Sequence, residues 1–129
     1  MVCTVKVQVN RSIDDIPSAE WDALAGDDPF LRHAFLAALE HSGSACAESG
    51  WLPLHLSCRD DHGRLVGALP LYLKSHSYGE FVFDWAWADA YQRHGLRYYP
   101  KLVSAVPFSP VPGPRLLLWP PLTRTRPAR

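Results

Sequence analysis

Residues 51–74, WLPLHLSCRDDHGRLVGALPLYLK, decide the fold of this 129-residue chain. In residues 51–58, a leucine stands at every second position from 52 to 56, and this alternation is the pattern of a β-strand. Residues 60–63, DDHG, form a hairpin turn signal that ends on glycine, and residues 64–74 return as a second strand. Because two strands joined by a tight turn must be antiparallel, we expect an α+β or mixed α/β fold and not a doubly wound parallel sheet.

Single residues refine the prediction for this hairpin. Leu52, Leu54 and Leu56 are two residues apart and therefore share one face of the first strand. Gly67 and Pro70 interrupt the returning strand, so a β-bulge or an edge position is expected there.

A further strand is predicted close to the N-terminus. Residues 4–10, TVKVQVN, alternate strictly between polar and apolar side chains. Val5, Val7 and Val9 then lie on the same side of the strand. We expect this valine side to be the buried one.

Two helices are predicted between that strand and the hairpin. Residues 17–25 suit a short helix with Pro17 near its first position, and Gly26 ends it. The second helix is expected to start at Asp28, which can cap the free N–H groups, and at the proline that follows it. Gly43 ends this helix. Its apolar stripe is expected to consist of Phe30, Leu31, Ala34, Phe35, Ala38 and Leu39.

The C-terminal half of the chain alternates between strand-like and helical stretches. Residues 86–94 have a helical composition, whereas residues 81–83, 98–106 and 115–118 are predicted to be short extended segments. Residues 119–129, WPPLTRTRPAR, are low in complexity and are predicted to form a disordered tail rich in arginine and proline.

Composition excludes several classes of protein. Hydrophobic residues make up 47% of the chain, a larger share than disordered chains contain. The length of the chain is that of one domain. Thirteen bases balance thirteen acids, so a dedicated nucleic-acid binder is not expected. The two signs of charge are unevenly distributed along the chain. Asp89 is the last acidic residue, so all charged residues in 90–129 are basic. No stretch is long, uncharged and proline-free enough to span a bilayer.

Cysteine usage bears on the compartment and on metal binding. Cys3, Cys46 and Cys58 are too few for a disulfide framework, and the N-terminus lacks the apolar core of a signal peptide, so a cytoplasmic location is expected. His55, Cys58 and His62 are close in sequence, but His55 and Cys58 would face opposite sides of a strand. We therefore expect no zinc site.

Aromatic residues gather in residues 81–100, FVFDWAWADAYQRHGLRYYP. One interpretation is a strand face packed in the core, followed by the start of a helix. The other is the wall of a cleft that stacks on a flat or sugar-like ligand. The candidate substrate-binding residues in this second interpretation are Trp85, Trp87, Tyr91, Tyr99 and Lys101.

Three polar residues are the candidates for catalysis. His76 could act as a general base and Tyr78 as a proton donor, although a loop histidine is commonly just solvated. Asp84 lies inside the aromatic run, where it either caps the following helix or acts with a raised pKa. The sequence contains no GxxxxGK[ST], GxGxxG or GxSxG motif.

Three segments in sequence order resemble the FemAB-like family. They are PLYLKSHSYGEFVFDWAWADAYQRHGLRYYPKLVSAVPFSPVPGPRLL (70–117), DDPFLRHAFLAALEHSGSA (27–45) and GWLPLHL (50–56). Members of this family are bacterial N-acyltransferases related to the peptidoglycan-modifying Fem enzymes, with the GNAT (acyl-CoA N-acyltransferase) fold. The resemblance implies that residues 1–118 form the N-terminal part of such a domain, with a mostly antiparallel sheet and flanking helices.

The resemblance also implies a reaction and its substrates. An acyl group from acyl-CoA, or an aminoacyl group from aminoacyl-tRNA, would be transferred to the amine of a small-molecule, peptide or glycan acceptor. Family members have two GNAT-like halves, so this chain resembles a truncated member that lacks the acyl-CoA site, and no cofactor is expected in the chain itself. The alternatives are a non-catalytic binding module with an aromatic groove and a non-functional fragment.

Overall fold

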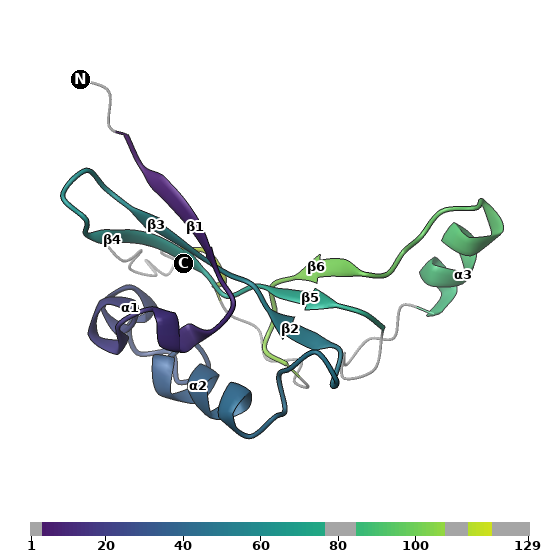
Figure 1. Cartoon of the computed structure of the whole chain (residues 1–129), viewed down its shortest axis with the longest axis horizontal. Helices are drawn as coiled ribbons and strands as arrows, with labels where there is room; N and C mark the ends of the chain where they lie inside the picture. Colours follow the sequence, from purple (N-terminus) through teal and green to yellow (C-terminus); the bar gives the residue numbers. More distant parts are fainter. Residues whose placement is uncertain (1–3, 77–84, 108–113, 120–129) are drawn as a thin grey trace, which may run out of the picture.

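The computed structural model describes residues 4–76, 85–107 and 114–119 (Figure 1). It contains three α-helices, one short 3-10 helix and seven strands within these residues. The strands are β1 (Lys6–Asn10), β2 (Trp51–Pro53), β3 (His55–Arg59), β4 (Leu65–Leu69), β5 (Tyr72–Lys74), β6 (Lys101–Val103) and β7 (Leu117–Leu118). The helices are η1 (Ile13–Asp15), α1 (Ser18–Ala25), α2 (His33–His41) and α3 (Trp85–Arg93).

The strands form two antiparallel sheets, which confirms the α+β prediction. One sheet has the order β1-β3-β4-β7 and the other the order β2-β5-β6. In Figure 1, α1 and α2 lie on the same side of the four-stranded sheet, and α3 lies beyond the far end of the three-stranded sheet.

The predicted hairpin is present, and it runs through both sheets. β2 and β3 are separated only by Leu54, whose N–H donates to the carbonyl of Leu71 at 2.9 Å between β4 and β5. Its turn forms as predicted, with Gly63 at φ 77° and the Asp60 carboxylate accepting two backbone N–H groups. The expected bulge lies near Gly67, where the pairing register shifts.

The strand alternation is confirmed, and the buried face is the one opposite Leu52, Leu54 and Leu56. Trp51, Pro53, His55 and Ser57 are buried, whereas the leucines between them are only half-buried. The valine side of β1 is likewise exposed, so the prediction that it is buried was wrong. Lys6 and Gln8 on the other side of β1 are exposed as well, and only Asn10 of this strand is buried. The buried polar side chains Asn10, His55 and Ser57 are tolerated because they are hydrogen-bonded.

The helices also differ from the prediction in one boundary. α1 follows Pro17 and ends at Gly26, as predicted. The second helix was expected to start at Asp28, but α2 starts at His33, because the Asp28 carboxylate caps only a single turn. The cap of α2 comes from α1, where Asp22 Oδ1 accepts the His33 N–H at 2.8 Å.

The apolar stripe of α2 is shifted from the predicted positions as well. Leu36 and Ala37 are buried, whereas Ala34 and Ala38 are exposed. The core beneath the four-stranded sheet joins α1, α2 and the sheet through Trp21, Leu24, Leu31, Leu36, Ala68 and Leu117.

Candidate functional site

A row of three side chains crosses the three-stranded sheet at one end. Trp51 of β2 pairs with Lys74 of β5, and Lys74 pairs with Lys101 of β6. Directly paired residues of antiparallel strands project from the same face of a sheet. Lys74 is fully buried, and its Nζ lies 4.7 Å from the centroid of the Trp51 ring. The row therefore places a cation against an aromatic face inside the protein.

Two tyrosines contact the last lysine of this row, and a third packs on one of them. Lys101 Nζ lies 4.6 Å from the ring centroid of Tyr98 and 5.1 Å from that of Tyr99, and it donates to Tyr98 Oη at 3.1 Å. The ring of Tyr98 packs edge-on against Tyr91 at 5.1 Å and against Tyr99 at 4.9 Å. We call Tyr91, Tyr98, Tyr99 and Lys101 the tyrosine–lysine cluster.

The tyrosine–lysine cluster is accessible from outside the protein. Tyr91 is exposed, and Tyr98, Tyr99 and Lys101 are half-buried. Flat rings of this kind stack on the apolar faces of ligands, and their hydroxyl groups donate and accept hydrogen bonds. A lysine held over the rings adds a positive charge for an anionic or polar group. The cluster thus has the chemistry of a site for a sugar-like or peptide ligand.

The structure brings together three of the five residues predicted to bind substrate. Tyr91, Tyr99 and Lys101 belong to the tyrosine–lysine cluster. Trp85 and Trp87 are on α3, the helix that carries Tyr91, and their side chains lie outside the described part of the structure.

Of the predicted catalytic residues, only His76 lies among the described residues. It follows β5 and packs on Gly50, where an added Cβ would be 2.5 Å from His76 Nε2. Gly50 precedes Trp51, so His76 is at the same end of the sheet as the Trp51–Lys74–Lys101 row. Tyr78 and Asp84 lie outside the described residues.

Sequence reasoning missed three residues of this region: Trp51, Lys74 and Tyr98. Lysine is rarely buried, and Lys74 is the last residue of the predicted returning strand, so nothing in the sequence marks it as buried. Tyr98 was passed over for its neighbour Tyr99. The repeated aromatic character of residues 98–99, followed closely by a lysine, is the signal that could have identified it.

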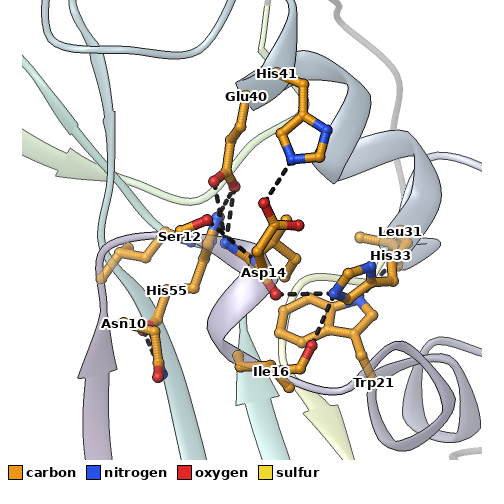
Figure 2. Close-up of polar contacts among 12 residues, drawn as sticks. Asn10, Ser12, Asp14, Ile16, Trp21, Leu31, His33, Glu40, His41 and His55 are labelled. Atoms are coloured by element: carbon orange, nitrogen blue, oxygen red, sulfur yellow. Dashed lines mark hydrogen bonds and ion pairs between the residues drawn. The ribbon is translucent and has the colours of Figure 1, made fainter.

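The hairpin that carries this row is anchored by Glu40 of α2 (Figure 2). Its side chain accepts the Ile13 N–H at 3.0 Å and the His55 Nε2–H at 2.9 Å. The Leu71 N–H donates to His55 Nδ1 at 3.2 Å, so the ring hydrogen of His55 is on Nε2. Both nitrogens of this buried histidine are therefore satisfied by the fold.

Aromatic packing continues from this anchor to the row. The His55 ring lies edge-on to Tyr72 at 5.2 Å, and Tyr72 lies edge-on to Trp51 at 5.4 Å. Burial raises the pKa of Tyr72, and the nearby charge of Glu40 raises it further, so its hydroxyl is protonated at neutral pH. This hydroxyl has no hydrogen-bond partner among the residues described. The positions of Trp51 and Lys74 thus depend on a path of contacts that starts at Glu40.

Two more histidines tie α2 to η1 (Figure 2). His33 Nε2 donates to the carbonyls of Ile13 and Ile16, each at 2.8 Å. His41 Nε2 bonds to Asp14 Oδ2. Together with Glu40, these contacts fix the segment that leads from β1 into α1.

The His41–Asp14 contact predicts a pH dependence of stability. The hydrogen bond that His41 Nε2–H donates to the Asp14 carboxylate, helped by the negative charge of Asp14, raises the pKa of His41 above the ordinary 6.5. The folded state therefore favours the protonated ring, and the stabilisation is complete below pH 6.5 and is lost as the pH rises through the raised pKa. The stability difference between wild type and Asp14→Asn in urea titrations is expected to be largest below that pKa.

Asp15→Asn is the matched control, since Asp15 is the next residue and forms no ion pair with a histidine among the residues that the structure describes. Its stability difference from wild type should be the same on both sides of the His41 pKa. A pH-independent effect of Asp14→Asn would contradict the prediction.

A pocket of about 450 Å³ lies at a different place, between α1 and β4. Its two charged residues are already engaged, because Glu20 pairs with Arg59 at 2.6 Å and Arg64 pairs with Asp60 at 3.2 Å. It shares no residue with the tyrosine–lysine cluster. We take the cluster as the candidate site because it combines accessible rings with a cation.

Within residues 4–76, 85–107 and 114–119, no three His, Cys, Asp or Glu side chains are grouped so that they could hold a metal ion. His55 and Cys58 project from opposite faces of β3, as their pairing with β1 shows. None of the described helices has the length and apolar character needed to cross a bilayer.

Comparison with known proteins gives a family match. The FemAB-like family model, described as peptidoglycan biosynthesis/recognition, matches residues 12–128. The matched region continues past Leu118, where the resemblance was expected to end. No curated protein and no solved structure matches the chain significantly.

Proposed function

This chain belongs to the FemAB-like family of peptidoglycan biosynthesis and recognition, and on that premise we propose that its tyrosine–lysine cluster binds the acceptor of an N-acyl transfer. The acceptor would be an amine on a peptidoglycan-type molecule, that is, an amino sugar carrying a short peptide. The observation that supports this proposal is the position of Lys101 Nζ over two tyrosine rings at an accessible surface.

The chemistry of the cluster suits both parts of such an acceptor. Sugar rings present C–H groups that pack on aromatic faces, as the rings of Tyr91, Tyr98 and Tyr99 would allow. Peptide carboxylates carry negative charge, and the ammonium of Lys101 favours such a group nearby. Tyr98 Oη accepts from Lys101, and a phenolic hydroxyl is able both to accept and to donate hydrogen bonds.

The proposed reaction forms an amide at the acceptor nitrogen. The amine attacks the acyl carbonyl carbon, the bond from that carbon to the sulfur of CoA breaks, and a base accepts the proton released from nitrogen. His76 is the candidate base at this end of the sheet, and Tyr78 and Asp84 are further candidates. The family resemblance supports acyl-CoA as donor, with aminoacyl-tRNA as the alternative. A binding module would use the same cluster without this chemistry.

Lys101→Met provides the test of binding. We expect wild type to bind a muramoyl-peptide in isothermal calorimetry and the variant to bind it about tenfold more weakly, a difference of about 1.4 kcal/mol, since the variant loses the positive charge that attracts an anionic group of the ligand. Leu102→Met is the matched control, because Leu102 is the next residue of β6 and projects from the other face. Its affinity should equal that of wild type.

Each outcome bears on one part of the proposal. Equal affinity of Lys101→Met and wild type would remove the cluster from the proposed site. Binding of the muramoyl-peptide with no amide product, when acyl-CoA and aminoacyl-tRNA are each supplied, would support the binding module in place of the transferase.

A further inference from the structure

The four-stranded sheet has one face that no described helix covers. α1 and α2 lie on the other face (Figure 1), where Ala68 and Leu117 join their core. The strand register places the remaining side chains on the open side, since paired residues share a face. We call this set the valine face, and it consists of Val5, Val7, Val9, Leu56, Cys58, Leu69 and Leu118.

The valine face is apolar, and four of its seven residues are exposed while Leu56, Cys58 and Leu69 are half-buried. Its exposed fractions are 53% for Val5, 62% for Val7, 58% for Val9 and 40% for Leu118. It contains no charged residue, because Lys6 and Arg59, which are paired with each other, project from the helix side. Contiguous apolar surface of this kind marks an interaction site in folded proteins.

Register also shows how large and small side chains are distributed over this face. One cross-strand row consists of Val9, Leu56 and Leu69, which are all branched. The neighbouring row runs from Val7 through Cys58 and Gly67 to Leu118, so its two middle residues are small. The face therefore has a bulky row beside a row with small residues at its centre.

We propose that the valine face packs against the valine face of a second copy of this chain. A two-fold axis between the two sheets would set the bulky row of each copy against the small-centred row of the other, so the surface is complementary to itself. Because neither face carries a charge, the contact buries none. A partner with a charged or polar surface would lack this complementarity. The dimer is independent of the tyrosine–lysine cluster, which is on the other sheet.

The mass of the full chain as a function of concentration tests this proposal. In sedimentation velocity, wild type is expected to change from monomer to a discrete dimer as its concentration rises, whereas Val7→Lys stays monomeric. Leu102→Lys is the matched control, because Leu102 is equally exposed, at 61%, but belongs to the three-stranded sheet. Circular dichroism checks that each variant is folded.

Cys58 gives a second measurement that needs no variant. It is on the valine face and has a free thiol, so its alkylation, followed by mass spectrometry, is expected to slow about tenfold as the dimer reaches about nine-tenths of the protein. Cys46, which is also a free thiol but not on this face, should react at a constant rate.

Three outcomes would overturn the proposal. The first is a wild type that is monomeric at every concentration with Cys58 freely reactive. The second is a monomer with Cys58 protected at every concentration, because another part of the same chain would then cover the face. The third is a dimer, or polydisperse aggregate, that Val7→Lys and Leu102→Lys leave equally unchanged.

Discussion

Replacing Glu40 by alanine is expected to lower the free energy of unfolding by about 3 kcal/mol. The Glu40 carboxylate is nearly buried and accepts hydrogens from the Ile13 amide and from His55 Nε2. Alanine would leave both donors without an acceptor inside the protein, and His55 is completely inaccessible to water. Urea titration followed by tryptophan fluorescence measures the loss.

Two further variants separate this effect from the simple removal of a charge. Glu40→Gln keeps one carbonyl oxygen, so its loss is expected to be smaller, at about 1–2 kcal/mol. Glu20→Ala removes a carboxylate from a partly exposed ion pair with Arg59, and we expect a loss below about 1 kcal/mol. If Glu40→Ala were as stable as Glu20→Ala, Glu40 would not anchor β3.

The same variant has a consequence for the candidate site. His55 packs on Tyr72 and Tyr72 on Trp51, so a loosened His55 removes support from the residue that contacts Lys74. Ligand binding by Glu40→Ala is therefore expected to weaken even where the protein remains folded, although Glu40 is not part of the tyrosine–lysine cluster. Glu40 is in this sense a positioning residue.

The hairpin could be predicted from sequence because its determinants are local. Asp60 and Gly63 form the turn through contacts within five residues, and a turn of this length fixes the antiparallel direction of β3 and β4. The bulge lies beside Gly67 in β4, and its place follows from the presence of a glycine in the strand.

The buried face could not be predicted, because its determinants are far apart in the sequence. Alternation identifies two faces but does not say which one meets the helices. Here the Glu40 carboxylate accepts a hydrogen bond from His55, and Asn10 Nδ2 donates to Ser57 Oγ at 2.9 Å. The polar face of β3 can therefore be buried. The start of α2 was misplaced for a similar reason, since its cap is Asp22 of the preceding helix.

The candidate site was predictable in part. Tyr91, Tyr99 and Lys101 were found because they are concentrated in one stretch of aromatic sequence. Trp51 and Lys74 belong to the hairpin, which is distant in sequence from these three residues. They come next to Lys101 only because β5 pairs with β2 on one side and with β6 on the other. Strand pairing of this kind depends on the whole sheet and is not visible in any single stretch of sequence.

The second large effect is expected at Trp21, and Trp21→Ala should lower the free energy of unfolding by about 4 kcal/mol. Trp21 is completely buried among the residues that join α1 and α2 to the sheet. Its Nε1–H donates to the Leu31 carbonyl at 2.7 Å, and its ring lies edge-on to His55 at 6.1 Å. Alanine would leave a large cavity and an unsatisfied carbonyl. Urea titration of the folded variant, followed by circular dichroism, measures the loss without relying on tryptophan emission.

Trp21→Phe divides this loss into its two causes. Phenylalanine retains most of the apolar volume but cannot donate to Leu31, so we expect a loss of about 2 kcal/mol. Trp119→Ala is the control for tryptophan removal as such, since Trp119 is exposed and its loss should be within about 0.5 kcal/mol. If Trp21→Phe were as unstable as Trp21→Ala, the hydrogen bond would dominate over packing. If neither variant were destabilised, α1 would not be held to the sheet through Trp21, and the burial of the polar face of β3 beneath the helices would need another cause.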